Sequence, residues 1–250
     1  VVPSDKPSDA YKAVAENAKQ FLPDYMHPWM NRSVCKRTVM TIPYNATKDS
    51  SRKYIREALL EKGINPTKDE LTQVVNAIYS SMDSIVPGPM NVMRWIKKHV
   101  GLYIRNGAKE VEWVTPSGFT VNQKRDDIET QIMELQLLGR TQVRIPTGKT
   151  TPSPTKHKSS TAPNYIHSFD ASILHRSFNH FDEPFTVIHD SVLCRAGDMG
   201  TLNRLVRETY SNIFSEKCWL SEFAETINAS EPPPIVGTLD PCLIYTSPSP

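Results

Sequence analysis

Two short, mainly apolar runs separated by a polar turn constrain the fold of this chain more than any other feature of its sequence. Residues 185–188 form the first run, residues 192–193 form the second, and His189, Asp190 and Ser191 lie between them. This pattern predicts a β-hairpin. The hairpin holds a lone carboxylate, Asp190, at its tip, backed by apolar side chains that favour burial. An ionised carboxylate held in this way can bind Mg²⁺, although an ordinary hairpin with a polar turn has the same pattern.

A second segment, residues 32–44, carries cations at helical spacing. Read as a helix, it places four side chains along one stripe at four-residue steps and a further cation beside them: Arg32, Lys36, Met40 and Tyr44, with Arg37. Cations fixed on one face suit a triphosphate, and the aromatic ring suits the sugar or base of the same nucleotide. Pro43 predicts that the helix kinks or stops just before Tyr44. A solvated basic helix face has the same spacing.

Taken together and in this order, the two segments resemble motifs of the single-subunit, bacteriophage-type RNA polymerases, which are also found in mitochondria and plastids. The helix 32–44 is similar to that family's nucleotide-binding helix, and His189-Asp190-Ser191 is similar to its second catalytic-aspartate motif. A third block, residues 163–170, resembles the segment that enters the family's palm just before the hairpin. The resemblance covers most of the chain, roughly residues 29–222.

The resemblance implies an α+β fold made of the fingers and palm of a right-hand polymerase, in a fragment of a larger polymerase. Residues 1–163 would form the mostly helical fingers part, and residues 164–240 would form the palm part with the catalytic hairpin. The implied function is DNA-directed RNA synthesis, in which a nucleotide is transferred from a nucleoside triphosphate to an RNA 3′ end on a DNA template. The partners would be template and promoter DNA, the RNA product and nucleoside triphosphates, and the intact protein would be a monomer.

The resemblance also assigns roles to matched residues. The expected nucleotide-binding residues are Arg32, Lys36, Arg37, Tyr44 and His167. The expected catalytic residues are Asp190, Lys36, Tyr44 and His189. Tyr44 and His167 would sense the ribose 2′-hydroxyl, and Asp190 would be one of two aspartates that hold a pair of Mg²⁺ ions as cofactors. From its position alone, a half-buried histidine bonded to the backbone is the favoured interpretation of His167.

Two departures from the family pattern affect this interpretation. Asn45 stands where the family usually has Gly after its tyrosine, and because Asn can adopt positive φ, we expect the backbone path to be preserved. The motif of the other catalytic aspartate should precede Arg32 by a long stretch, and residues 1–30 do not resemble it. We therefore expect a fragment with half of a metal site, which binds Mg²⁺ weakly and does not polymerise alone.

The two ends of the chain support the expectation of a fragment. The sequence starts at Val1, without an initiator Met and without the charged and apolar regions of a signal peptide, which predicts an internal cut. Residues 241–250 read like a translated sequencing adapter, and we expect this tail to be non-native and without function.

The region between the helix motif and the hairpin is basic. No acidic residue lies between Glu134 and Asp170, and residues 146–163 are so polar and rich in proline that little core is expected there. In the resembling family, a β-hairpin in this region enters the major groove of the promoter. Arg can address guanine and Gln adenine, so the expected DNA-binding residues are Gln136, Arg140, Gln142 and Arg144. A flexible surface loop that contacts only phosphates is the alternative.

Other elements follow from periodicity and turn signals. Amphipathic helices are predicted over residues 8–21, 67–82 and 90–103, and a hairpin over residues 111–121. Further along, we expect a helix from His167 to about His180, a helix capped by Asp198 with Leu202, Leu205, Val206 and Phe214 facing the core, and a peripheral connection over residues 216–234.

Composition sets wider limits. With 250 residues the chain can form one large domain or two, and its net charge of +2 favours no partner by itself. No apolar run is long enough to cross a bilayer, so no membrane partner is expected. The four cysteines show no paired spacing, which argues against a zinc site or a disulfide framework and favours a reducing compartment. We expect the cytoplasm, of the host cell if the parent is viral, in preference to a mitochondrion or plastid.

Two other functions remain open at this point. Family A DNA polymerases share the Lys-to-Tyr helix and a His-Asp hairpin, but there the aspartate is usually followed by Glu, where this chain has Ser191. Arg37 and the His167-Ser168 pair also favour RNA synthesis. A non-catalytic nucleic-acid-binding subunit, or one half of a split polymerase, is the third possibility. A binding module would tolerate Asp190→Asn, whereas a polymerase completed by its partner would lose its chemistry and still bind template.

Overall fold

The computed structural model describes residues 9–136, 139, 141–189 and 191–235. In this part of the chain, eight α-helices are formed: α1 Ala10–Ala18, α2 Arg32–Thr41, α3 Lys48–Leu60, α4 Lys68–Ile85, α5 Pro87–Arg105, α6 Pro154–Phe178, α7 Met199–Glu216 and α8 Trp219–Thr226. Four short 3₁₀ helices are η1 Lys19–Phe21, η2 Asp24–Trp29, η3 Ile42–Tyr44 and η4 Ala196–Asp198. The strands are β1 Val111–Val114, β2 Thr120–Gln123, β3 Asp126–Leu135, β4 Thr141–Pro152, β5 Phe185–Ile188 and β6 Ser191–Cys194.

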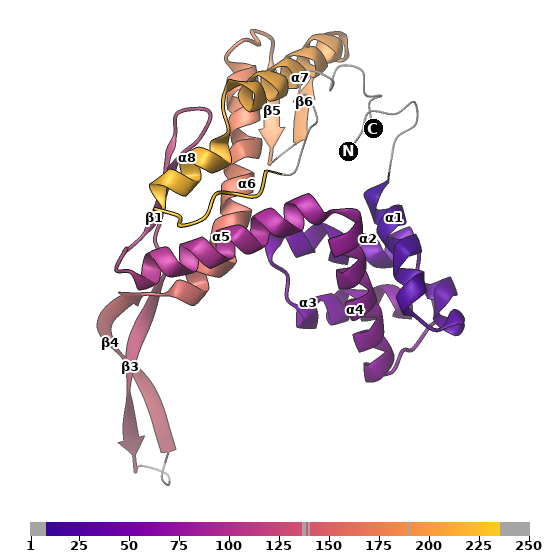
Figure 1. Cartoon of the computed structure of the whole chain (residues 1–250), viewed down its shortest axis with the longest axis vertical. Coiled ribbons are helices and arrows are strands. Elements are labelled where there is room, and N and C mark those ends of the chain that lie inside the picture. The colour runs from indigo at the N-terminus through magenta and orange to yellow at the C-terminus, as the bar shows by residue number, and fades with distance from the viewer. Residues whose placement is uncertain (1–8, 137–138, 140, 190, 236–250) are drawn as a thin grey trace.

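The strands pair as three separate antiparallel hairpins, β1-β2, β3-β4 and β5-β6. Helices therefore make up most of the described structure, and the sheets are small. Figure 1 shows α5 crossing the middle of the molecule, with α1 to α4 gathered at one end of it and α6 near the other. This arrangement confirms the predicted α+β class.

Helices α1 to α4 pack around the first of two apolar cores. α4 contributes a buried stripe at helical spacing that includes Val74, Ile78 and Met82. It begins with a capping box, in which the Thr67 hydroxyl accepts from the Glu70 backbone N–H and the Glu70 carboxylate accepts from the Thr67 backbone N–H. The helices predicted over residues 8–21, 67–82 and 90–103 are confirmed as α1, α4 and α5, within a few residues at each end.

Helix α5 joins the two cores. Its first turns place Met90 and Met93 in the first core, and its later turns place Trp95 and Val100 in the second. The second core also takes in side chains of β1, α6 and α8. The hairpin predicted over residues 111–121 is confirmed as β1-β2, and its Trp113 is buried in this core.

The prediction that residues 146–163 form a polar connection with little core is wrong. Their first part belongs to β4, and α6 begins at Pro154 rather than at His167. His157, Thr161 and Ala162 are buried, because α6 packs against α5, which it crosses in Figure 1, and against Gln123 and Arg125 at the base of β3. Proline and polar composition are local signals, and here packing between two long helices overrides them. The boundary predicted at residue 163 lies inside α6, and the division into fingers and palm remains a prediction.

The prediction of a peripheral connection over residues 216–234 is also wrong. This segment contains α8, and its Phe223 and Ile227 are buried in the second core. α7 starts directly after Asp198, as predicted, but the Asp198 side chain pairs with Arg195 instead of capping the helix. Among the expected core side chains of α7, Leu202 is buried and Leu205 and Val206 are half-buried, whereas Phe214 is exposed.

Strands β3 and β4 form a long antiparallel hairpin that projects from the body as an arm (Figure 1). Asp126 pairs with Pro152 at its base and Leu135 with Thr141 near its end, with an irregularity between Ile128 and Thr130. Nearly every described residue of the arm is exposed. The described residues therefore form the hairpin that the resemblance implies for this region, and its contacts with bases or with phosphates stay a prediction.

A buried histidine holds the base of the arm. The backbone N–H of Arg125, just before β3, donates to His157 Nε2 over 3.2 Å, and the Gln123 amide lies 3.4 Å from His157 Nδ1. The same amide donates to the Thr161 hydroxyl over 2.7 Å. Burial, together with the charge of Arg125, lowers the pKa of His157, and the nearby Asp126 opposes this shift. The neutral imidazole is therefore the form that fits the folded chain.

This network predicts a loss of stability in mild acid. Because the pKa of His157 is lower in the folded chain than its unfolded value of about 6.5, its contribution is complete above that pH. As the pH falls below about 6.5, the unfolded chain takes up the proton first, and stability falls by at most about 1.4 kcal/mol per pH unit. Urea unfolding between pH 7.5 and 5 measures this slope. His157→Gln should flatten it, whereas the control His180→Gln, at an exposed position, should leave it unchanged. An equal slope in both variants would rule out His157 as the source.

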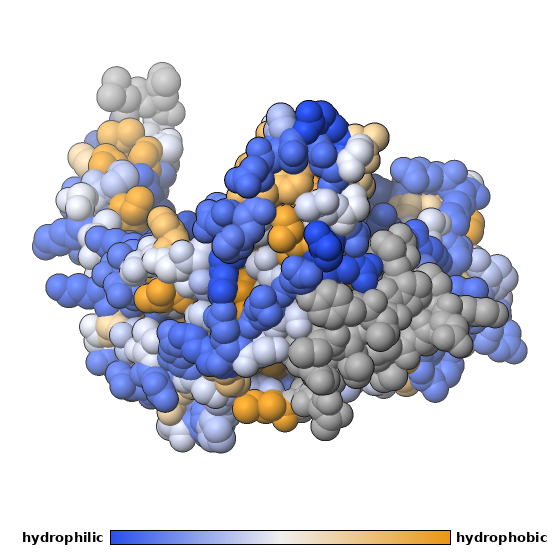
Figure 2. Space-filling view, turned by 90° about the horizontal axis from the view of Figure 1, so that it is seen from above, coloured by the Kyte–Doolittle hydropathy of each residue, from blue (hydrophilic) through white to orange (hydrophobic). Residues whose placement is uncertain are grey.

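One face of the molecule is largely polar. In Figure 2, most of the coloured residues on this face are blue, and the orange apolar residues lie in small separate patches. Nowhere in the described ranges does a helix have the length and apolar character needed to cross a membrane. The three cysteines within those ranges are free thiols, and burial raises the pKa of Cys35 to about 12.

Candidate active site

Helix α2 divides its side chains between the first core and a solvent-exposed stripe. Val34, Cys35, Thr38 and Val39 are buried. The exposed stripe consists of the side chains predicted from the spacing: Arg32, Lys36, Met40 and Tyr44, with Arg37 beside them. Asn31 caps the helix by accepting from the Val34 backbone N–H. The spacing of the apolar side chains thus determines which face of α2 packs on the first core. The basic stripe lies on the face that remains exposed to solvent.

The end of α2 has the form predicted from Pro43. The α-helix stops at Thr41 and continues as the 3₁₀ helix η3 through Tyr44. Asn45 then adopts the left-handed conformation, with φ 66° and ψ 30°. The expectation that Asn45 preserves a positive-φ path is confirmed. This turn brings Tyr44 out of the α2 axis and towards α6.

Three rings from distant parts of the sequence lie side by side. The Tyr44 ring lies 4.7 Å from the His167 ring of α6, measured between centroids. His167 in turn lies 6.1 Å from the His189 ring, edge to face. His167 is exposed, so the alternative of a half-buried histidine is wrong. The structure therefore brings together three of the residues that the resemblance selected, from η3, α6 and the turn after β5.

The cations of α2 differ in their surroundings. Arg32 Nε lies 2.6 Å from Asp9 Oδ2, and this hydrogen bond lowers the pKa of the Asp9 carboxyl. The Arg37 guanidinium pairs with Glu57 over 2.9 Å and lies over the Tyr54 ring at 4.0 Å. Lys36 forms no ion pair with any other described residue.

The partners of the two arginines cannot be recognised from the sequence. Asp9 and Glu57 are separated from Arg32 and Arg37 by 23 and 20 residues. No local spacing signal connects residues so far apart, because the contacts depend on how α1 and α3 pack against α2. As far as the described residues show, the stripe therefore contains one cation that is open to a ligand, Lys36, and two that are already held in place.

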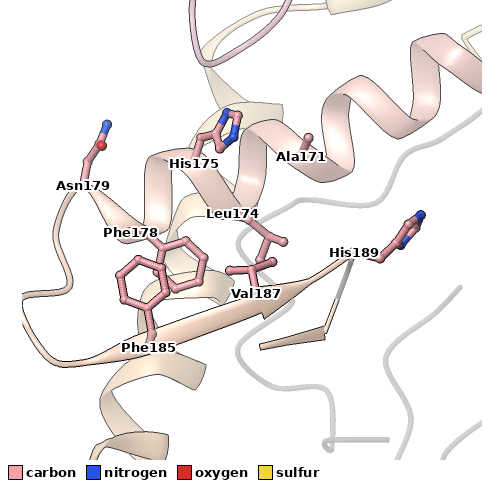
Figure 3. A pocket seen from close by; sticks show the side chains of 8 residues that line it. All are labelled: Ala171, Leu174, His175, Phe178, Asn179, Phe185, Val187 and His189. Atoms are coloured by element: carbon pink, nitrogen blue, oxygen red, sulfur yellow. The ribbon is translucent and has the colours of Figure 1, made fainter. Parts of the chain in front are cut away.

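The β5-β6 hairpin packs one of its ends against α6. The Phe178 and Phe185 rings are stacked at 3.9 Å, as Figure 3 shows, and His189 lies at the other end of β5. A pocket of about 430 Å³ lies between α6 and this strand. His189 has a positive φ of 59°, which places it in the turn. Asp190, the next residue and the expected metal ligand, lies outside the described residues.

The predicted burial of the hairpin's apolar side chains is wrong for the described part of the chain. Val187, Ile188 and Leu193 are exposed by 39%, 65% and 56%. Contacts with Phe178 and α6 cover only part of the hairpin, and the described residues leave the remaining apolar side chains in contact with water. An apolar surface of this kind beside a candidate active site is typical of an interaction surface.

Comparison with known proteins decides the family. A model of the DNA-dependent RNA polymerase family matches residues 1–234. The chain belongs to the single-subunit RNA polymerases of phages and mitochondria. It is 27% identical to the mitochondrial DNA-directed RNA polymerase of Homo sapiens over 253 aligned residues, covering 94% of this chain and 20% of that protein. It is 30% identical to T7 RNA polymerase of Escherichia phage T7, covering 81% of this chain and 26% of that protein.

This RNA polymerase chain thus spans about a fifth to a quarter of the length of these two relatives. A further relative, the DNA-directed RNA polymerase of Pseudomonas phage phiKMV, is 25% identical, covering 84% of this chain and 27% of that protein. The predicted resemblance is therefore confirmed. Since the relatives come from phages and from mitochondria, the comparison favours neither compartment.

RNA polymerases of this family generally depend on Mg²⁺, whose preferred ligands are carboxylate oxygens. Within the described ranges, no three side chains of His, Cys, Asp or Glu gather closely enough to hold a metal ion. Asp190 is a ligand of the right chemistry, and its placement lies outside those ranges. One carboxylate fits the requirements of this cation, but a pair of ions needs further oxygen ligands.

The arm carries the polymerase residues predicted to contact DNA. Gln142 and Arg144 lie two positions apart on β4, so both side chains project from the same face. The Gln142 amide donates to Glu134 of β3 over 3.2 Å. Gln136 follows β3 directly, and Arg140 lies outside the described residues. The arm therefore places at least two of the four candidates on one exposed face.

Proposed function

We propose that this chain contains the nucleotide-binding region and part of the catalytic centre of a DNA-directed RNA polymerase. The reaction is nucleotidyl transfer from a nucleoside triphosphate to an RNA 3′ end, directed by a DNA template. The observation that carries the proposal is the cluster of Tyr44, His167 and His189 rings next to the exposed cations of α2. Family membership indicates the reaction class, and we propose that the nucleotide binds at this ring cluster.

The α2 stripe would bind the triphosphate. Lys36 presents three N–H donors and a positive charge to solvent, and such a donor makes strong hydrogen bonds to phosphate oxygens. Arg32 and Arg37 add positive charge beside it while Asp9 and Glu57 hold them in position. Because negative charge develops on the leaving pyrophosphate, cations fixed at this place would also lower the barrier to the reaction.

The ring cluster would recognise the sugar. The Tyr44 hydroxyl and the His167 imidazole can each donate or accept a hydrogen bond, as a ribose 2′-hydroxyl can. Both side chains are exposed, so a nucleotide held by Lys36 would reach them without any opening of the core. His189 would lie beside the RNA 3′ end. A site built in this way would favour ribonucleotides over deoxyribonucleotides.

Asp190 would be the metal-binding residue of this chain. Bound Mg²⁺ would make the attacking 3′-hydroxyl more acidic and offset the charge of the leaving pyrophosphate. The second aspartate expected for such a site has no counterpart in residues 1–30, so we propose that it is supplied by polymerase sequence outside this chain. The exposed apolar side chains of β5-β6 are a suitable surface for that sequence to pack against.

Primer extension on a DNA template tests this function. The chain is joined behind the N-terminal part of a single-subunit RNA polymerase that supplies the other aspartate, and incorporation of ribonucleotides and deoxyribonucleotides is compared with and without Mg²⁺. We expect Mg²⁺-dependent ribonucleotide incorporation. A preference for deoxyribonucleotides would assign the chain to DNA synthesis. Template binding without extension, by a fusion with a native circular dichroism spectrum, would indicate a non-catalytic module.

Removing Lys36 should weaken nucleotide binding more than removing Arg37. A hydrogen bond to a charged group contributes about 1.5–3 kcal/mol, so Lys36→Ala should weaken ATP binding roughly 10- to 150-fold. The Arg37 guanidinium is already engaged with Glu57 and Tyr54, so Arg37→Ala should weaken binding only a few-fold. Isothermal titration with ATP measures both. Equal losses would mean that the Arg37–Glu57 pair opens when the nucleotide binds.

The arm would contact promoter DNA through β4. If Arg144 reads a base, Arg144→Ala should cost about 1–3 kcal/mol on the preferred duplex and relax specificity at one base pair. Lys149→Ala, a change of charge on the same strand, should instead weaken binding to all sequences and reduce the salt dependence by about one ion. Binding to duplexes with single base-pair substitutions distinguishes the two effects. A uniform loss in both variants would show that the arm contacts only phosphates.

A further inference from the structure

The carbonyl group of Ser159 in α6 lacks its usual helical partner. In an α-helix, this carbonyl accepts from the backbone N–H four residues later, and here that residue is Pro163, which has no N–H. The Asn45 side-chain amide donates to the Ser159 carbonyl oxygen instead, over 3.2 Å. A residue 114 positions away in the sequence thus replaces the missing backbone donor.

Asparagine is well suited to position 45 for two independent reasons. With φ 66° the backbone is left-handed, a conformation that Gly adopts freely and Asn adopts more readily than most other residues. The amide also supplies a donor, which Gly lacks and which the carboxylate of Asp lacks at neutral pH. Gly is the residue usual in the family, and it would satisfy the backbone requirement alone. Asn45 therefore adds a contact to α6 that a Gly cannot make.

This contact lies next to the ring cluster. Ser159, Pro163 and His167 follow one another at four-residue steps, so they lie on the same face of α6. Asn45 directly follows Tyr44, whose ring contacts His167 at 4.7 Å. Two neighbouring residues of η3 and its cap thus contact two positions of one α6 face, one by a hydrogen bond and one by ring packing.

We propose that Asn45 is a positioning residue for nucleotide selection, which holds η3 against α6 so that Tyr44 and His167 meet at the spacing needed to recognise a ribose. This inference rests on the proposed function, because it gives Tyr44 and His167 the task of sensing the sugar. It adds a residue that does not touch the nucleotide. Pro163 is also required for this contact, because its missing N–H leaves the Ser159 carbonyl available to Asn45.

The test uses the 250-residue chain and two readouts. The first is the nuclear Overhauser effect between the Tyr44 and His167 rings. The second is the ratio of the dissociation constants for 2′-deoxyATP and ATP. Asn45→Gly keeps the left-handed backbone and removes the donor. The matched control is Asn228→Gly, which also replaces a left-handed asparagine, with φ 49°, but one that follows α8 rather than η3.

We expect Asn45→Gly to weaken the ring contact and to lower the deoxyATP to ATP ratio about threefold or more, as the loss of one hydrogen bond allows. Asn228→Gly should change neither readout. Unchanged ring contact and unchanged ratio in Asn45→Gly would overturn the proposal. If the unsubstituted chain binds both nucleotides equally, the sugar-sensing role of the proposed function fails, and the ring contact alone then decides whether Asn45 positions Tyr44.

A double variant separates positioning from simple stabilisation of α6. Asn45→Gly combined with Pro163→Ala restores a backbone donor for the Ser159 carbonyl, so thermal stability should recover. The link between η3 and α6 is still missing, so the nucleotide ratio should stay low. If Asn45 served only to satisfy the carbonyl, stability and selection would recover together, and that result would contradict the proposal.

Discussion

Replacing Asp190 by asparagine is expected to reduce nucleotide incorporation about 10³-fold or more while leaving ATP binding almost unchanged. The positive charge of a bound metal ion stabilises the transition state by several kcal/mol, and each 1.36 kcal/mol corresponds to a factor of ten in rate. An amide has nearly the shape of a carboxylate but no negative charge, so it binds Mg²⁺ much more weakly. The triphosphate contacts proposed for α2 lie on another element and do not require Asp190.

Single-turnover extension by the fused polymerase, over a series of Mg²⁺ concentrations, measures this effect. Asp182→Asn is the matched control, because Asp182 is an exposed aspartate just before the same hairpin. It should retain the rate of the unsubstituted fusion within about twofold, as a surface change of small energetic effect would. A rate for Asp190→Asn within tenfold of the control would refute the assignment of Asp190 as a metal ligand.

The parts of the site that could be predicted from sequence depend on local signals. Four-residue spacing predicted the α2 stripe, because residues at that spacing lie on one helix face. Pro43 predicted that the α-helix ends before Tyr44, because proline lacks a backbone N–H and its ring clashes with the preceding helical turn, although Ile42 itself stays helical with φ -57° and ψ -47°. Each of these rules concerns residues within one or two turns. The resemblance added what spacing alone cannot supply, namely that Tyr44, His167 and His189 share one place.

The parts that could not be predicted depend on contacts between distant segments. Pro163 stands inside α6 although proline predicts a break, because α5 packs against that helix and Asn45 supplies a partner for the Ser159 carbonyl. The ion pair between Arg37 and Glu57 depends on the packing of α3 against α2. The acidic and proline-rich composition of the segment around α8 predicted a connection instead of a helix. For α6 and α8, the local rules on proline and polar composition were outweighed by packing between distant segments, whereas no local rule applies to the ion pair.

The helix α8 leads to a prediction about the stability of the fold. It has eight residues, and isolated helices of that length are marginal in water. Phe223 is its buried anchor, with 2% of its surface exposed and its ring 4.7 Å from Tyr165 and 6.2 Å from Trp113. Phe223→Ala should therefore lower the free energy of unfolding by about 3–5 kcal/mol, through lost burial and the cavity left behind.

Urea unfolding followed by tryptophan fluorescence measures this loss, with Phe119→Ala as the control. Phe119 is 65% exposed in the turn of the β1-β2 hairpin, so its removal should change the unfolding free energy by no more than about 0.5 kcal/mol. Hydrogen exchange then shows how the loss is distributed. If α8 simply detaches, its amides exchange quickly, α6 stays protected and the loss in unfolding free energy is small. That result would mean that the second core does not need α8. If protection falls in α5 and α6 as well, Phe223 joins these helices into one cooperative unit that supports His167 and the ring cluster.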